Sequence, residues 1–231
     1  MLPNKTQAAK NNKNIVDYKL AKERLTLALY SNGSGTHKFP LFVISKSRKP
    51  RAFKNISNLS ALPVHYRAQK SAWMDRESFS KWFNNVYVPE VAIKLKDKNL
   101  PQKAILLLDN APSHPTDLKK NEVRTIFLPP NVTPLIQPMD QGVIESLKRR
   151  YRSKFLSSLI EKTATGFSLM EAVKSINIKD VIYMLAVGKS FRHQHWKNLR
   201  KKSDRTSMTI KPRRFKRTCI PWFSSCTIGN I

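Results

Sequence analysis

The sequence predicts an α/β fold, and three stretches of the chain carry this prediction. Ala104–Leu108 is an uninterrupted aliphatic run, typical of a strand buried on both faces, and it ends abruptly at Asp109. The apolar segments Arg24–Tyr30 and Phe39–Ile44 are separated by a turn rich in Gly and Ser, which predicts a hairpin. From Met139 onward, apolar residues recur at steps of three and four, the pattern of a long amphipathic helix. We therefore expect a buried sheet flanked by helices.

The other elements follow from the same patterns. Arg124–Leu128 is predicted to be a second short strand, stopped by two prolines that cannot donate to a ladder. Residues 71–95 carry aromatic and aliphatic residues at helical spacing, with Pro89 bending or interrupting the helix and a cap at Asp75 or Ser71. Aromatic residues at this spacing favour a core helix over a platform on which bases stack.

Two further helices are predicted between Phe167 and Val187, where Ser168 and Glu171 have the spacing of a capping box. Beyond them apolar periodicity disappears near Leu199 while lysine and arginine become frequent. We therefore predict one domain over residues 1–200 and a basic flexible tail over residues 201–231.

The charge of the chain says more about its binding partner than about the reaction it could catalyse. The 231 residues include 43 Lys and Arg against 15 Asp and Glu, a net charge of +28. Nucleic acid is the expected partner, and a membrane is not, because no run approaches the ~20 apolar residues of a spanning helix. Cys219 and Cys226 lack the neighbouring ligands of a zinc site, which favours a reducing compartment. The first residues lack the apolar core of a signal peptide, so secretion is not expected.

Two aspartates are candidates for catalysis and for metal binding. Asp109 follows the most apolar strand, and Asp140 lies in the first turn of the predicted long helix. Mg²⁺ prefers hard oxygen ligands, and carboxylates at such positions can hold it against a phosphodiester. Chemistry of this kind normally requires a third acid.

The residues around these aspartates resemble a known family. Leu106–His114, Ile126–Ile144 and Leu147–Tyr151 are similar to the DDE superfamily endonuclease domain, and more narrowly to its pogo, Tigger and Jerky group, which includes centromere protein B. The resemblance covers roughly residues 1–200. It implies a ribonuclease H-like fold, with three acids on a mixed sheet and a following helix, and transposase chemistry that uses Mg²⁺.

The resemblance also assigns the acids. Asp109 matches the second acid of the family and Asp140 the third, whereas the first lies on a strand that precedes the segment resembling Met1–Thr6. We therefore expect the central first strand and its acid to be absent, Mg²⁺ binding to be weak or absent, and catalysis to be lost. Neither Asp17 nor Asp75 is expected to substitute. The sheet should be gapped, or completed by the segment near Ile15 and Val16.

These observations leave three functions open. The first is a transposase-derived nuclear domain that binds DNA with low sequence specificity and does not cut it. The second is an active Mg²⁺-dependent endonuclease or transposase with a substitute or partner-supplied acid, and the third is a protein-interaction module or a relic fragment. Candidate contacts to nucleic acid are Lys148, Arg149 and Arg150 on the long helix, although these residues also fit a solvated helix face, and Lys211, Arg213 and Arg214 in the tail.

Two residues beside Asp109 have smaller expected roles. His114 either forms hydrogen bonds near the metal site or serves as a structural histidine of the turn. Asn110 is expected to brace the turn that follows the strand.

Overall fold

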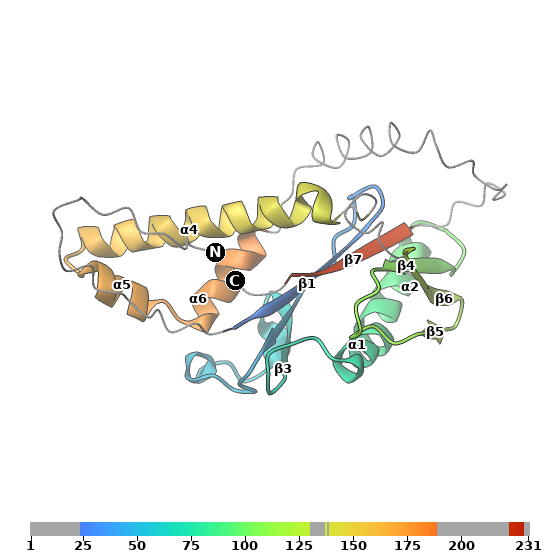
Figure 1. The fold of residues 1–231 in the computed structure, drawn as a ribbon, viewed down its shortest axis with the longest axis horizontal. Coiled ribbons are helices and arrows are strands. Elements are labelled where there is room, and N and C mark those ends of the chain that lie inside the picture. Colours follow the sequence, from blue (N-terminus) through green and yellow to red (C-terminus); the bar gives the residue numbers. More distant parts are fainter. Residues whose placement is uncertain (1–23, 130–136, 138, 189–221, 229–231) are drawn as a thin grey trace.

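The strands of the protein form one mixed sheet. The computed structural model describes residues 24–129, 137, 139–188 and 222–228. Its strands are β1 (Thr26–Asn32), β2 (Leu41–Ser45), β3 (Val64–Ala68), β4 (Ala104–Leu108), β5 (Lys119–Lys120), β6 (Val123–Phe127) and β7 (Trp222–Ile228). Within the described residues the spatial order is β3-β2-β1-β7-β4-β6-β5 (Figure 1). Strands from opposite ends of the chain therefore meet at the centre of the sheet.

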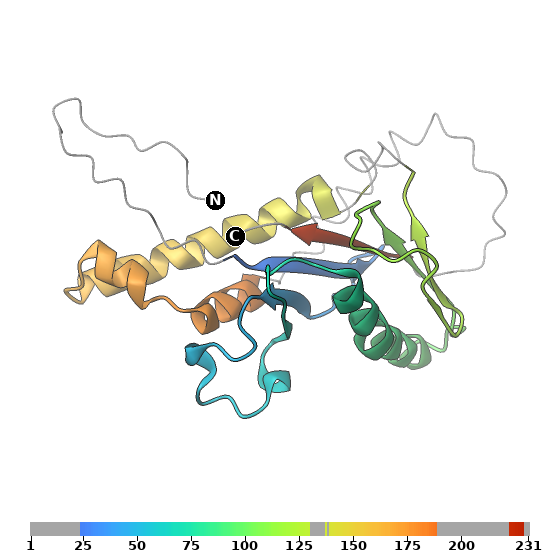
Figure 2. The same cartoon turned by 60° about the horizontal axis from the view of Figure 1, so that its bottom comes forward.

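Helices cover both faces of this sheet. The α-helices are α1 (Arg76–Trp82), α2 (Val88–Asp97), α4 (Ile144–Ala164), α5 (Leu169–Ser175) and α6 (Ile178–Gly188). Two short 3-10 helices lie at Arg51–Phe53 (η1) and Leu59–Ala61 (η2). Two short π-helical turns lie at Phe83–Tyr87 (η3) and Met139–Val143 (η4). Figures 1 and 2 show α4 and α6 on one side of the central strands, with α1 and α2 on the other.

The predicted hairpin is confirmed as β1 and β2. The two strands pair antiparallel from Thr26↔Ile44 to Ala28↔Phe42, and the Asn32 amide donates to the His37 carbonyl at 3.0 Å across the turn. The segment before the aromatic helix, whose conformation the sequence did not define, forms β3 and pairs parallel to β2. The hairpin and β3 together make up one half of the sheet.

Alternate residues of β1 enter two separate cores, as expected of a strand buried on both faces. Leu27 and Leu29 pack into a cluster with Leu147 and Ile182 from α4 and α6. Ala28 and Tyr30 face the opposite cluster, which includes the aromatic residues Phe79, Trp82, Phe83 and Tyr87. The prediction that the aromatic residues are core is therefore confirmed for these four, and it is wrong for Trp73, which is 53% exposed.

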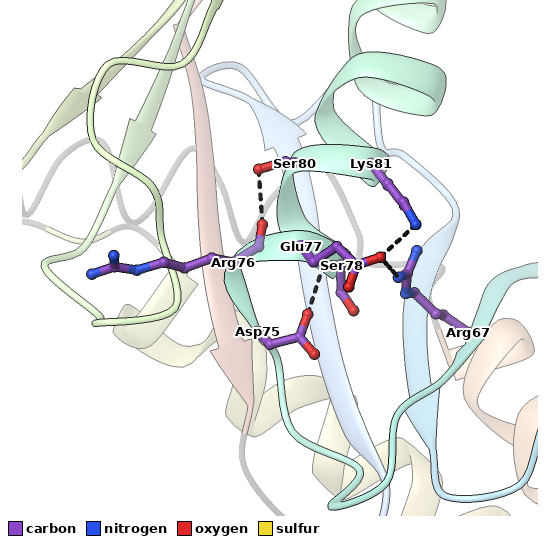
Figure 3. A network of polar contacts seen from close by, with 7 residues as sticks. All are labelled: Arg67, Asp75, Arg76, Glu77, Ser78, Ser80 and Lys81. Atoms are coloured by element: carbon purple, nitrogen blue, oxygen red, sulfur yellow. Dashed lines mark hydrogen bonds and ion pairs between the residues drawn. The ribbon is translucent and has the colours of Figure 1, made fainter.

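The aromatic stretch folds in three consecutive pieces. Asp75 caps α1 by accepting a hydrogen bond from the Ser78 amide at 2.7 Å (Figure 3), which confirms one of the two predicted caps. The π-helical turn η3 follows and leads directly into α2, of which Pro89 is the second residue. The three pieces follow without a gap and the backbone stays helical at both junctions, so Pro89 lies just after a π-helical interruption of one helical stretch, as the predicted interruption requires.

Strand β7 occupies the centre of the sheet. It pairs antiparallel with β1, from Leu27↔Ile228 to Asn32↔Phe223, and parallel with β4, from Ile105↔Trp222 to Leu107↔Ser224. The expectation of a gapped sheet was therefore wrong, and so was the assignment of Trp222–Ile228 to a flexible tail. The alternative filler, Ile15 and Val16, lies outside the described residues, as do residues 201–221 of the predicted tail.

The other predicted elements are present. β4 and β6 correspond to the two apolar runs around Asp109, and α4 corresponds to the long amphipathic helix. The capping box at the start of α5 is formed, since Ser168 and Glu171 exchange hydrogen bonds in both directions. No helix in the described part of the chain is long and apolar enough to cross a membrane. The mixed α/β architecture is compatible with the ribonuclease H-like fold that the resemblance implies.

Candidate functional site

Asp109 lies immediately after β4, at the carboxyl end of a central strand. Its side chain is 21% exposed, so the carboxylate is largely enclosed yet open to solvent on one side. The edge of a sheet beyond the carboxyl ends of parallel strands is a common place for binding sites. The structure therefore places the predicted second acid where a ligand can reach it.

His114 closes the turn that follows Asp109. Its side chain is fully buried, and its ring lies 4.6 Å from the ring of Phe79 in α1. The His114 Nδ1 atom lies 3.2 Å from the main-chain carbonyl of Asp109 and 3.0 Å from Asp109 Oδ1. The carbonyl contact has hydrogen-bond geometry, whereas the carboxylate contact has only ion-pair distance. Both predicted roles of His114 are thus compatible with its position, since it fixes the turn and touches the carboxylate.

Further hydrogen bonds hold the turn to its surroundings. The Asn110 side-chain amide donates to the Leu128 carbonyl at 2.7 Å, and the Leu128 amide donates to the Leu108 carbonyl at 2.8 Å. The Arg76 guanidinium, from the first turn of α1, donates to the Pro112 carbonyl at 3.1 Å. The brace predicted for Asn110 is confirmed, and the loop is tied to β6 and to α1 at once.

Asp140 lies in η4, the turn that leads into α4. Met139 and Val143, on the same turn, are buried and belong to the core beneath α4. The turn η4 packs against β7, the strand beside β4. The backbone at Asp140 is therefore held over the centre of the sheet, while its side chain lies outside the described part of the structure.

The described residues do not supply a third acid. β7, which lies between β1 and β4, reads Trp-Phe-Ser-Ser-Cys-Thr-Ile and contains no carboxylate. Asp75 is engaged as the cap of α1, and Asp17 lies outside the described residues. Among the side chains that the structure describes, no group of three or more His, Cys, Asp or Glu could hold a metal ion. This set of residues does not fit a two-metal centre.

The basic residues predicted on the long helix occupy different environments on α4. Arg149 is exposed and donates to the Glu145 carboxylate at 2.6 Å, one turn earlier, and Lys148 is half-buried. Arg150 lines a groove of about 490 Å³ between α4 and α6. Lys211, Arg213 and Arg214 lie outside the described residues.

The groove combines cations, hydroxyls and an apolar wall. Its lining includes Lys154 and three serines from α4, together with Met184 and Val187 from α6 and one acid, Glu161. Lys38, in the hairpin turn, is a further cation near this end of α4. Burial and the charge of Arg150 together lower the pKa of Lys38 from its usual value of 10.5. Sequence reasoning missed Lys38, because nothing local marks a turn lysine as a neighbour of a distant helix.

The match to a family model decides the classification. The model of the DDE superfamily endonuclease matches residues 22–206. The chain belongs to the DDE superfamily endonuclease family. Domains of this family generally use divalent metal ions.

Individual relatives agree with this assignment. The chain is 36% identical over 199 residues to the Tigger transposable element-derived protein 7 of Homo sapiens. This alignment covers 79% of the chain and 36% of that protein. It is 42% identical over 137 residues to the Jerky protein homolog of Homo sapiens, covering 58% of this chain and 24% of that protein. The ARS-binding protein 1 of Schizosaccharomyces pombe is 29% identical over 170 residues, covering 72% of this chain and 31% of that protein.

The chain thus spans about a quarter to a third of the length of these curated relatives. No solved structure gives a significant match.

Proposed function

We propose that this chain is a transposase-derived DDE domain that binds DNA with low sequence specificity and does not cleave it. The observation that carries the proposal is the strand beside Asp109, since β7 fills the centre of the sheet without a carboxylate. In the family pattern, the strand at this position of the ribonuclease H-like sheet contributes the first acid.

Charge supports the binding half of the proposal. A net charge of +28 gives long-range attraction to a polyanion, and the basic side of α4 presents Arg150 and Lys154 at a groove with three serine hydroxyls. Hydroxyls and cations are the usual donors to phosphate oxygens. One relative is named for binding to ARS, which favours DNA as the polyanion. Contacts of this kind position a duplex but do not read its sequence.

The site around Asp109 supports the second half. A single carboxylate paired with a buried histidine is a poor Mg²⁺ site, because Mg²⁺ needs several oxygen ligands in octahedral geometry. We therefore expect Mg²⁺ binding at Asp109 and Asp140 to be weak or absent. The nucleus is the proposed compartment, in keeping with DNA as the partner and with a basic segment at Lys211, Arg213 and Arg214 that can act as an import signal.

A titration of the chain with labelled DNA duplexes tests the binding proposal. Unrelated sequences should bind with similar affinity, and the affinity should fall by at least about tenfold between 50 and 200 mM salt, as expected when several phosphate contacts release counterions. Affinity that is independent of salt, or that is confined to one sequence, would contradict the proposal and favour a protein-interaction module.

One observation favours a second candidate function, that of a metal-dependent endonuclease with an acid from elsewhere. Asp109 Oδ1 is buried and lies 3.0 Å from His114 Nδ1 without hydrogen-bond geometry, so the carboxylate has capacity left for a cation. A Mn²⁺ titration of the chain and of Asp109→Asn separates the two functions. Saturable binding that Asp109→Asn abolishes would support this second function, and no difference between the two proteins would support the first.

A further inference from the structure

The main-chain groups of β1 and β4 that face each other need hydrogen-bond partners. With β7 in place, Leu27, Ala28 and Leu106 are fully buried, so the main-chain groups of β1 and β4 that face β7 have a strand and not water as their partner. Each buried main-chain group left without a partner costs about 1–3 kcal/mol. The halves β3-β2-β1 and β4-β6-β5 therefore form a stable single sheet only if a strand enters between them.

The entering strand must also have the correct direction. It must run antiparallel to β1 and parallel to β4, and β7 does both: Phe223–Ile228 pairs with β1, and Trp222–Ser224 pairs with β4. Trp222, Phe223, Thr227 and Ile228 are residue types enriched in strands. The requirements of the space and the properties of the C-terminal segment thus match in length, direction and residue type.

We propose that the space between β1 and β4 is a strand-binding site, that this chain fills it with its own C-terminal segment, and that β7 brings no acid to Asp109. The last clause rests on the proposed function, whereas the first two stand without it. The occupant is the segment of the same chain, since β7 is reached from α6 through residues 189–221, a length that spans the molecule easily.

The register defines which residues of β7 lie level with Asp109. Leu106 pairs with Phe223 and Leu107 pairs with Ser224. Continuing this parallel register by two residues brings Cys226 level with Asp109, with Ser225 one step before it. Neither residue type is a ligand that Mg²⁺ prefers, because sulfur is soft and a hydroxyl is neutral.

Hydrogen exchange on the full chain tests the assignment without any substitution. The amides of Ser224–Thr227 should exchange on the order of 100-fold more slowly than unstructured amides, and as slowly as those of Ile105–Leu107. Fast exchange across Trp222–Ile228 would overturn the proposal. Protection that appears only at high concentration, together with a dimer in light scattering, would also overturn it, because the strand would then come from a second copy.

A pair of proline variants gives an independent check. Ser225→Pro removes a strand donor at the centre of the sheet and should lower the melting temperature by about 10 °C. Asn230→Pro, beyond the end of β7, is the matched control and should melt like the parent chain. Equal melting of the two variants would overturn the proposal.

The outcomes of these tests are separate from those of the DNA and metal titrations. A chain that binds DNA without cutting it but exchanges freely over β7 would retain the proposed function and lose the strand-binding site. Protected β7 amides together with saturable, Asp109-dependent metal binding would support the strand-binding site. The same result would contradict the proposal that the site at Asp109 lacks the ligands for a metal ion.

Discussion

Asp109 and His114 show how a short turn fixes a candidate ligand at the end of a buried strand. The histidine ring is enclosed against Phe79 and its Nδ1 atom faces the carbonyl of Asp109, so the ring holds the backbone at the residue whose carboxylate it also touches. The sequence identified Asp109 because a continuous apolar run ends there. It could not decide the role of His114, because burial against a residue of α1 is a tertiary property.

His114→Ala should lower the free energy of unfolding by about 3 kcal/mol, because it leaves a cavity in place of a fully buried ring and releases the turn. Chemical denaturation measures the loss. His65→Ala, at a histidine whose side chain is 32% exposed, is the control and should cost less than about 1 kcal/mol. Equal losses of unfolding free energy in the two variants would contradict the stabilising role of the buried His114 ring.

Asp75 gives a prediction about pH. Burial acts to raise the pKa of Asp75, but hydrogen bonds from Ser78 outweigh this effect and hold the pKa below its usual 3.8. A carboxyl whose pKa is depressed in the folded state stabilises the protein above pH 3.8, and this contribution is lost as the pH falls through the lower, folded value. Asp75→Asn should therefore flatten the dependence of unfolding free energy on pH below about pH 4, as measured by denaturation. An unchanged slope would contradict this role of the cap.

Helix α4 is the element that joins the candidate site to the core. Its buried side includes Leu147, which packs with β1 and α6, while its other side carries exposed residues such as Leu156. Because the apolar pattern along α4 is local, the sequence predicted this helix. The groove between α4 and α6 could not be predicted, since it depends on the angle at which two helices meet.

Leu147→Ala should destabilise the chain by about 3 kcal/mol because a fully buried leucine leaves a cavity. Leu156→Ala, on the same helix but half exposed, is the matched control and should cost well under half as much. Thermal or chemical unfolding of both variants checks the difference. A similar cost for both would mean that α4 is not packed on the sheet as described.

Strand β7 is the element that the sequence did not predict. The lysine and arginine residues between Lys189 and Arg217 dominate the composition of the C-terminal region, and this charge predicted a tail. The short run Trp222–Ile228 forms a strand because two distant strands, β1 and β4, offer it partners on both edges. Pairing across such a separation leaves no local pattern, so the sequence predicted the need for a central strand but not its source.

Across the whole molecule, charge and architecture both support the proposed function. A domain with net charge +28, helices on both faces of its sheet and a basic groove along α4 is suited to hold a phosphate backbone. The family membership supplies DNA-processing ancestry, and the acid-free central strand accounts for the proposed loss of cutting.

The double variant Arg150→Ala/Lys154→Ala should weaken binding to unrelated duplexes by a similar factor and reduce the steepness of the salt dependence by roughly one to two phosphate contacts. Lys94→Ala, on α2, removes a cation that is already paired with Asp97 and is the control. Fluorescence anisotropy at several salt concentrations measures both. If the control weakens binding as much as the double variant, the groove is not the contact surface.

A cleavage assay tests whether the domain binds DNA without cutting it. The full chain is incubated with supercoiled and linear DNA in Mg²⁺ and in Mn²⁺, beside Asp109→Asn and Asp140→Asn. We expect all three proteins to bind the DNA and the unmodified chain to cut it no faster than either variant. Metal-dependent cutting by the unmodified chain that disappears in both variants would contradict the account.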